Sequence, residues 1–358
     1  MATRAFTAAH EASGDAAGYI AADIALVHAV RGSIVQAREW LDVSRRYDLT
    51  GRWIEELVSL PADIAGMMVA TDRLDQTADH LLGRLENDTG QSELWPFVVQ
   101  ALTDYALTFG EAATALTAID RYSAQNPAVA EADGIGRRIL RRCTADLCLA
   151  LGNANRARLL IEGGGTVEAW LQPSWARLWL LNGDHARAFG IASDLIWDSA
   201  TPRDQLDLAM TKAAAAHALG DLELAKQSFA QGAALAASLG ALRPYLQIDV
   251  ETRGSLLDLY GTALDDEARS RLDTARQSYP DRAELVTLTE RELAVLYELT
   301  RSTSWSEIAD VLVVAPGTAK KQLVSLYAKL GVHDREAALL RATRLGFLPE
   351  PGVGAARA

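Results

Sequence analysis

Apolar residues recur at helical spacing along most of the chain, and no alternating strand-and-helix pattern interrupts them. A short motif divides this pattern: a glycine is followed five residues later by an alanine. The copies are Gly32 with Ala37, Gly110 with Ala115, Gly152 with Ala157, Gly183 with Ala188, and Gly220 with Ala225; a sixth copy has Arg73 in the glycine position and Ala78 after it. Successive copies are 31 to 42 residues apart. The pattern therefore predicts an all-α protein made of repeated helix pairs.

The residue types in the motif explain how such a pair forms. The glycine can end the first helix in a left-handed backbone conformation. Asn153, Asp184 and Asp221, which follow three of these glycines, can cap the second helix. The alanine lets the two helices approach closely. Each pair exposes an apolar face that only a neighbouring pair can bury, so we expect the pairs to stack.

The recurring turn, written LG-D/N-x-x-x-A, resembles that of the tetratricopeptide repeat over roughly residues 20–280. The resemblance implies an α-solenoid over residues 1–280 with a concave surface that binds a peptide, a protein or a small ligand. The alternative is an array that serves only as a spacer or dimer scaffold.

Two local features of this array are candidate ligand- or partner-binding sites. Trp175 and Trp179 lie one helical turn apart, a spacing that suits core packing and also suits a binding pocket. Arg138 and Arg142 also lie one turn apart, within a basic strip. That strip is either a solvated face paired with acids or a receptor for an acidic peptide or phosphate.

The pattern changes after Pro280, which breaks the preceding helix. We predict a linker at 281–286, a four-helix domain at 287–348 and a flexible tail at 349–358. Thr289 with Glu292, and Ser304 with Glu307, have the spacing of capping boxes that start the first two helices. Pro316 suits the first turn of the third helix, and the fourth follows Asp334.

The third helix has two faces at 100° per residue. Its core face comprises Ala319, Leu323, Leu326 and Leu330, and its opposite face comprises Lys320, Lys321, Val324, Ser325 and Ala328. Three short helices with a tight second turn make a helix-turn-helix. A purely structural helix also has a polar outer face, so this pattern leaves a DNA contact open.

The stretch "LTERELAVL…SEIADVLVVAPGTAKKQL…YAKLGVHDREAALLRATRLGFL" resembles the DNA-binding domain of LuxR-type transcription regulators over about 60 residues without gaps. The resemblance implies that a recognition helix begins at Thr318 and that the last helix forms a homodimer on double-stranded DNA. It implies contacts to base edges from Lys320, Lys321 and Val324, with Ser325 on the same face, and to phosphates from Thr318, Gln322, Lys329, Ser304 and Trp305. The whole chain resembles the MalT-like architecture without its ATPase.

Charge and composition narrow the function further. The net charge is -12, and residues 288–348 carry +1, so the rest of the chain is acidic and repels nucleic acid at long range. We find no phosphate-binding loop, no metal-ligand spacing and no nucleophile–base pair, and we expect no cofactor and no enzymatic activity. Cys143 and Cys148 read as free buried thiols, and the chain shows neither a signal peptide nor a membrane span, so we expect a cytoplasmic protein.

These observations predict a DNA-binding transcriptional regulator whose helical repeats bind a ligand or partner and thereby control dimerisation or DNA binding. The alternative is an interaction adaptor whose helix-turn-helix does not bind DNA. Three residues that depart from the family pattern, Ala315, Ala319 and Trp305, keep that alternative open.

Overall fold

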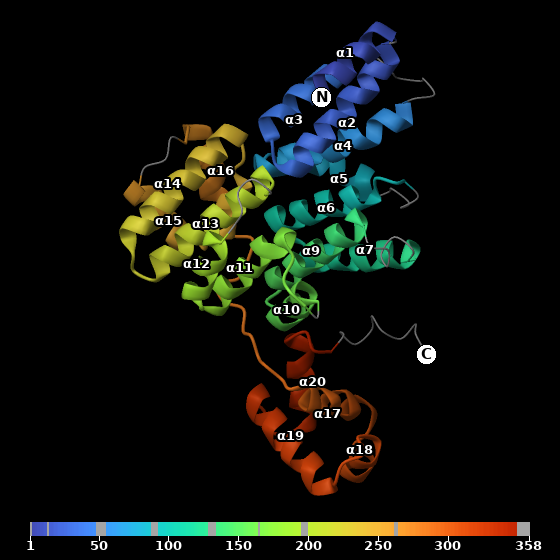
Figure 1. Cartoon of the computed structure of the whole chain (residues 1–358), viewed down its shortest axis with the longest axis vertical. Helices are drawn as coiled ribbons and strands as arrows, with labels where there is room; N and C mark the ends of the chain where they lie inside the picture. The colour runs from blue at the N-terminus through green and yellow to red at the C-terminus, as the bar shows by residue number, and fades with distance from the viewer. Residues whose placement is uncertain are drawn as a thin grey trace.

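The computed structural model describes residues 2–12, 14–47, 55–86, 92–127, 134–163, 165–194, 200–260 and 264–348. Every regular element in these ranges is a helix, which confirms the all-α prediction (Figure 1). No helix among them is both long enough and apolar enough to cross a bilayer. The predicted tail at 349–358 lies outside the described residues.

A helical array occupies the described part of residues 2–274, and neighbouring helices pack in pairs such as α2 with α3, α9 with α10, and α13 with α14. Its α-helices are α1 (Ala2–Ala12), α2 (Gly14–Arg31), α3 (Ile34–Ser44), α4 (Glu55–Asp72), α5 (Asp79–Glu86), α6 (Trp95–Tyr105), α7 (Ala112–Gln125), α9 (Ile135–Ala150), α10 (Ala154–Glu162), α11 (Gln172–Asn182), α12 (His185–Ser193), α13 (Pro202–Ala218), α14 (Leu222–Leu239), α15 (Val250–Tyr260) and α16 (Asp266–Thr274). The shorter elements are the 3-10 helices η1 (Gln76–Ala78), η3 (Ala169–Leu171) and η5 (Arg243–Gln247) and the π-helical turn η2 (Ala106–Gly110).

The repeated motif forms the predicted turns. All five of its glycines, Gly32, Gly110, Gly152, Gly183 and Gly220, have φ between 75° and 89°. The six alanines of the motif are buried. Asp184 and Asp221 cap α12 and α14 as expected, each accepting a backbone hydrogen bond of 3.1 Å. Asn153 makes no side-chain cap, contrary to expectation. In the sixth copy Leu74, the residue after Arg73, has the left-handed conformation.

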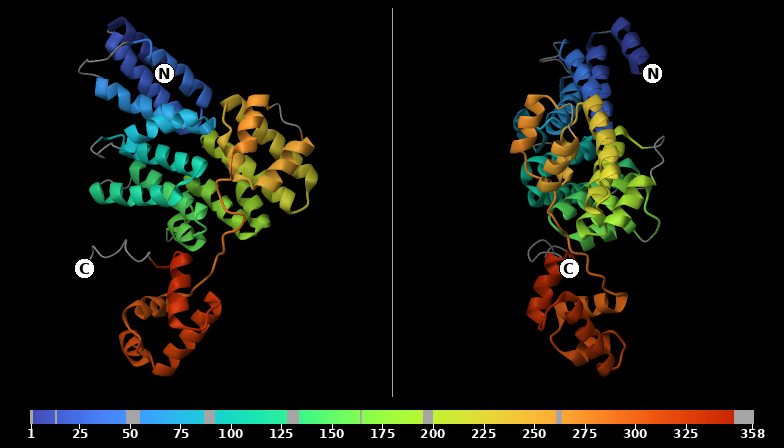
Figure 2. Two further views of the ribbon diagram at one scale, coloured as in Figure 1. Left: turned by 180° about the vertical axis from the view of Figure 1, so that it is seen from behind. Right: turned by 90° about the vertical axis from the view of Figure 1, so that its left-hand side faces the viewer.

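The later helices of the array pack back against the earlier ones, so the array closes on itself (Figures 1 and 2). Here α14 contacts α3 and η5 contacts α4, and Leu242 N–H donates to the Asp72 carbonyl at 2.6 Å. Gly32 is required at this closure because a Cβ there would lie 2.8 Å from the Cβ of Arg203. One continuous hydrophobic core runs through the array and contains the two free cysteines. Burial raises the pKa of Cys143 to about 12, as expected of an inert thiol.

A second hydrophobic core is built by α17 (Glu290–Arg301), α18 (Trp305–Val311), α19 (Pro316–Leu330) and α20 (Arg335–Arg344). This four-helix domain projects from one end of the array (Figure 2). Its first capping box is present, but the second is not, because Ser304 makes no side-chain cap and Ser302 Oγ instead donates to the Glu307 carboxylate.

The segment between α16 and α17 runs along the array rather than hanging free. Ser278 N–H donates to the Leu246 carbonyl at 2.8 Å, and Ala283 N–H donates to the Leu181 carbonyl at 3.0 Å. Ala283 is buried. We call residues 275–287 the connecting segment. The predicted linker at 281–286 lies within it.

Candidate nucleic-acid interface and interior cavity

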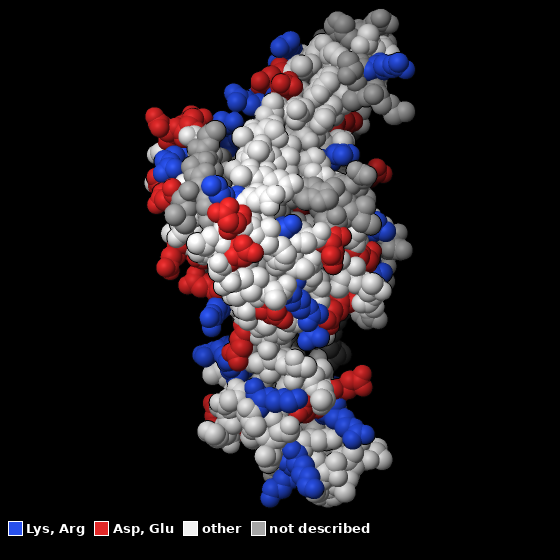
Figure 3. All heavy atoms as spheres, turned by 60° about the vertical axis from the view of Figure 1, so that its left-hand side comes forward, with Lys and Arg blue, Asp and Glu red and all other residues white. Residues whose placement is uncertain are grey.

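Helix α19 separates its apolar and polar residues as its sequence predicts. Ala319, Leu323, Leu326 and Leu330 are at most 5% exposed and pack into the domain core. Lys320 and Lys321 are exposed on the other side, and Val324 is 61% exposed. In Figure 3 basic side chains lie at the free end of this domain, and acidic and basic side chains are both spread over the array. The exposed face of α19 thus combines two cations with an apolar side chain, the mixture that base edges and phosphates require.

The start of α19 has an unusual backbone. Val313, in the turn that follows α18, has φ of 54° and is 88% exposed. Such a conformation is strained for a β-branched residue. Ala315 precedes the helix without a side-chain cap, and Pro316 occupies its first position as expected.

Glu292 on α17 holds α19 in place from within the domain. Its carboxylate accepts hydrogen bonds from Ser325 Oγ and Lys329 Nζ, both at 2.7 Å. It also accepts one from Thr289 N–H at 2.7 Å, which completes the capping box. Burial acts to raise the pKa of Glu292, but these bonds outweigh burial and lower it to about 2. Ser325 and Lys329, predicted as DNA contacts, are therefore engaged in joining α17 to α19.

The other predicted phosphate contacts lie around the same helix. Thr318 is exposed in the first turn of α19, Gln322 is half-buried, and Ser304 is half-buried at the start of α18. The side chain of Trp305 lies outside the described part of the structure.

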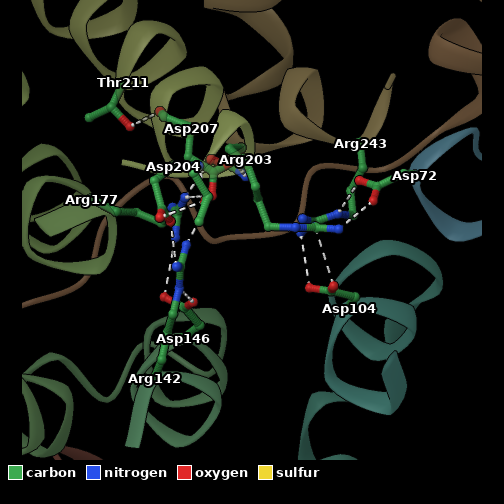
Figure 4. A network of polar contacts seen from close by, with 12 residues as sticks. Asp72, Asp104, Arg142, Asp146, Arg177, Arg203, Asp204, Asp207, Thr211 and Arg243 are labelled. Carbon is green, nitrogen blue, oxygen red and sulfur yellow. Dashed lines mark hydrogen bonds and ion pairs between the residues drawn. The ribbon is translucent and has the colours of Figure 1, made fainter. Parts of the chain in front are cut away.

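A cavity of about 280 Å³ lies inside the array, and five arginines and four aspartates contribute to its lining. On one side Arg203 and Arg243 hold two carboxylates (Figure 4). Asp72 Oδ2 and Oδ1 lie 2.7 Å from Arg203 Nη2 and 2.9 Å from Arg243 Nε, and Asp104 lies 3.3 Å from both guanidinium groups. Burial acts to raise the pKa of Asp72, but the two arginines outweigh burial and hold it below its ordinary value.

On the other side of the cavity Arg142 and Arg177 hold three carboxylates (Figure 4). Arg142 donates to Asp204 and lies 3.4 Å from Asp207 Oδ2, while Arg177 Nη1 lies 3.2 Å from Asp146 Oδ1. Residues from α9, α11 and α13 are thereby joined. Because breaking such a network leaves a buried charge unpaired, it fixes how these helices pack.

The structure separates the predicted binding residues of the array. Arg138 and Arg142 both line the cavity; Arg142 is paired with acids, whereas Arg138 is exposed and forms no ion pair with a described residue. Trp175 and Trp179 are only 7% and 6% exposed and pack edge to face with ring centroids 5.2 Å apart. Both tryptophans therefore pack in the core, which is one of the two roles that their spacing suggested; the other was a binding pocket.

The sequence analysis did not predict the ion-pair network of buried arginines and aspartates. A signal was present in "TPRDQLDLAM", where Arg203 and Asp207 lie one turn apart on a helix that is otherwise rich in apolar residues. Asp72, Arg177 and Arg243 stand in three other elements and give no local signal of their own.

Comparison with known proteins identifies the four-helix domain. Residues 286–342 match the family described as bacterial regulatory proteins, luxR family. The chain is also similar to the transcriptional regulatory protein LnrK of Bacillus subtilis (strain 168), with 41% identity over 63 residues, or 18% of this chain and 29% of that protein. The match thus spans less than a third of that relative. No solved structure matches the chain. The C-terminal part is accordingly a LuxR-type helix-turn-helix domain, and the family match begins after the helical array.

Proposed function

We propose that the protein is a DNA-binding transcriptional regulator in which α19 enters the major groove and the helical array controls that contact. The observation that carries the proposal is the exposed face of α19, where Lys320 and Lys321 flank the accessible Val324 within a LuxR-type domain. The name of the relative LnrK is consistent with this role. DNA contact then depends on two lysines, because Glu292 engages Lys329.

Control by the array is supported by how the domain is attached. Asn155 of α10 is buried and touches the domain at both of its ends. Its Nδ2 donates to the Leu345 carbonyl at 3.2 Å, and its Oδ1 accepts from Val286 N–H at 3.1 Å. Arg341 of α20 also pairs with Glu284 in the connecting segment. A change in the array near α10 therefore reaches both the start and the end of the DNA-binding domain.

The attachment involves the helix that the family resemblance assigns to dimerisation. The end of α20 continues into Leu345 and Gly346, and a Cβ at Gly346 would lie 2.9 Å from the Cβ of Arg156 in α10. We infer that the array restrains α20 and that release of this contact frees it for a homodimer on DNA.

DNA binding is tested by fluorescence anisotropy with a labelled duplex at several salt concentrations. We expect Lys320→Ala with Lys321→Ala to abolish most of the affinity at low salt. The dependence of log K on log salt should become shallower by roughly 2, because each lysine removed from the groove no longer neutralises phosphate charge, at about 0.9 per cation. The matched control is Arg38→Ala with Arg46→Ala, which removes two exposed cations from the array. Equal binding by both double variants would show that these two lysines do not make the DNA contact, and no binding by the wild-type chain at low salt would favour the adaptor alternative.

Control is tested in the same assay with Asn155→Ala. Loss of both hydrogen bonds should loosen the domain and raise the DNA affinity of the full-length chain. An unchanged affinity would show that the array does not restrain the domain through this side chain.

A further inference from the structure

One arginine that lines the interior cavity forms no ion pair with a described residue. Arg142, Arg177, Arg203 and Arg243 are each engaged with aspartates. Arg138, which lines the same cavity, has no ion pair with a described residue and is exposed at its open edge. The lining therefore offers an accessible cation beside a buried network in which four arginines meet five aspartates.

Two arginines that line the cavity also have buried hydrogen-bond donors without partners. The Nε–H groups of Arg177 and Arg203 find no acceptor among the described residues, although these side chains are only 1% and 6% exposed. Buried polar groups in native proteins nearly always have a partner. A guanidinium group can only donate, so a partner for these Nε–H groups would have to be a hydrogen-bond acceptor.

The cavity is also lined by apolar side chains. Val30, Ile135 and Ile139 line it, together with the ring of Trp170. Val30 and Ile135 also line a larger, more open groove of about 1320 Å³ between α2, α4, α5 and α6. The charged cavity and this groove are thus adjacent, and a molecule that entered the cavity could extend along apolar side chains.

We propose that this cavity binds a small organic acid, whose carboxylate pairs with Arg138 and whose hydrocarbon part lies along Val30, Ile135 and Ile139. A single carboxylate matches the single unpaired guanidinium. A phosphate ester, with up to two charges, would meet the four lining aspartates at greater cost. This proposal names the chemical class of the ligand through which the array would control DNA binding, and it rests on the proposed function only for that control.

The cavity is connected to the DNA-binding domain through Tyr279. This residue of the connecting segment lines the cavity, and its ring lies 4.6 Å from the guanidinium carbon of Arg177. Tyr279 is buried, and the same segment is bonded to the array at Ser278 and Ala283 before it reaches Val286. An acid bound in the cavity would therefore lie against this segment.

The test titrates straight-chain acids from butanoate to octanoate into the full-length protein and follows tryptophan fluorescence and melting temperature. We expect saturable binding, with affinity rising up to about four-fold per added methylene as the hydrocarbon covers the apolar side chains of the lining. Hexanamide and hexylamine, which lack the negative charge, should bind at least ten-fold more weakly than hexanoate.

Two variants on α9 assign the binding to the cavity. Arg138→Ala should weaken octanoate binding about ten-fold or more, because it removes the paired cation. Arg137→Ala removes the neighbouring exposed cation, which does not line the cavity, and should leave binding unchanged. The proposal is wrong if no acid binds, if hexanamide binds as well as hexanoate, or if both variants retain the wild-type affinity.

The same samples distinguish this proposal from the proposed function. DNA binding is measured with and without octanoate at fixed salt. If octanoate binds through Arg138 and DNA affinity stays constant, the ligand site is supported and control by the array is contradicted. If octanoate fails to bind while Lys320 and Lys321 still support DNA binding, the ligand site alone is contradicted.

Discussion

Glu292 is the side chain whose removal should weaken the DNA-binding domain most specifically. Glu292→Gln keeps the shape of the side chain but removes the charge that attracts Lys329 Nζ at 2.7 Å. The amide can still accept a hydrogen bond from Ser325, so the change isolates the electrostatic part of the contact. The contact joins α17 to α19, and its loss should therefore loosen the recognition helix.

The magnitude follows from the pKa of Glu292, which is lowered from 4.5 to about 2. A difference of one pKa unit corresponds to about 1.4 kcal/mol, so the charged form stabilises the domain by at most about 3 kcal/mol. Because the side chain of Lys329 is 37% exposed, solvent screens the pair, and we expect about 2 kcal/mol. That value corresponds to about a 30-fold change in the opening equilibrium of α17 and α19.

The sign with pH follows from the lowered pKa. The stabilisation is fully present above the ordinary value of 4.5 and is lost as pH falls toward 2, where the folded domain also binds the proton. Wild type and Glu292→Gln should thus differ in opening at pH 7 and converge near pH 2. Hydrogen-exchange mass spectrometry of the full-length chain measures this for α17 and α19, with both proteins compared at each pH.

Glu290→Gln is the matched control, because it removes an exposed carboxylate from the same first turn of α17. It should change protection only slightly. The role assigned to Glu292 is wrong if hydrogen-exchange protection of α19 is the same in Glu292→Gln as in Glu290→Gln. It is also wrong if the difference in protection between wild type and Glu292→Gln persists at pH 2.

Two further predictions concern backbone strain and the buried network. Val313→Gly should stabilise the DNA-binding domain by up to about 1 kcal/mol. Glycine relieves the strain of a left-handed valine, about 1–2 kcal/mol, and this exceeds the entropy that glycine adds to the unfolded chain. Thermal unfolding measures the effect, and a lower melting temperature would contradict it. Asp72→Ala should destabilise the array by about 3–5 kcal/mol in urea unfolding, because Arg203 and Arg243 would share only Asp104. A loss below about 1 kcal/mol would show that the network does not stabilise the array.

Features that depend on neighbours in sequence were predictable. The turn at Gly183 needs only a left-handed residue, an aspartate directly after it and a small residue at position 188. All three lie within six residues of one another. The buried and exposed faces of α19 also follow from its own periodicity. The same applies to the capping box at Thr289, whose two partners are three residues apart.

The closure of the array and its charged cavity could not be predicted in this way. Asp72 and Arg203 are 131 residues apart, and Asp72 and Arg243 are 171 apart. Each stands in a helical element where a charged residue would ordinarily face solvent, so periodicity favours exposure. Only the return of α13 and η5 onto α4 places these charges together, and that return depends on the angles at which successive helix pairs stack.

The candidate DNA-binding surface shows the same limit on a smaller scale. Lys329 and Ser325 lie on α19 where a helical wheel allows contact with DNA, yet their partner Glu292 is 37 and 33 residues away on α17. The crossing of the two helices decides their role. It leaves Lys320 and Lys321 as the lysines of α19 available to DNA, and a recognition surface with so few free cations binds weakly at physiological salt. Pairing of two domains on one DNA would restore affinity, so our proposal of control by the array depends on the hydrogen bond from Asn155 to the residue that follows α20.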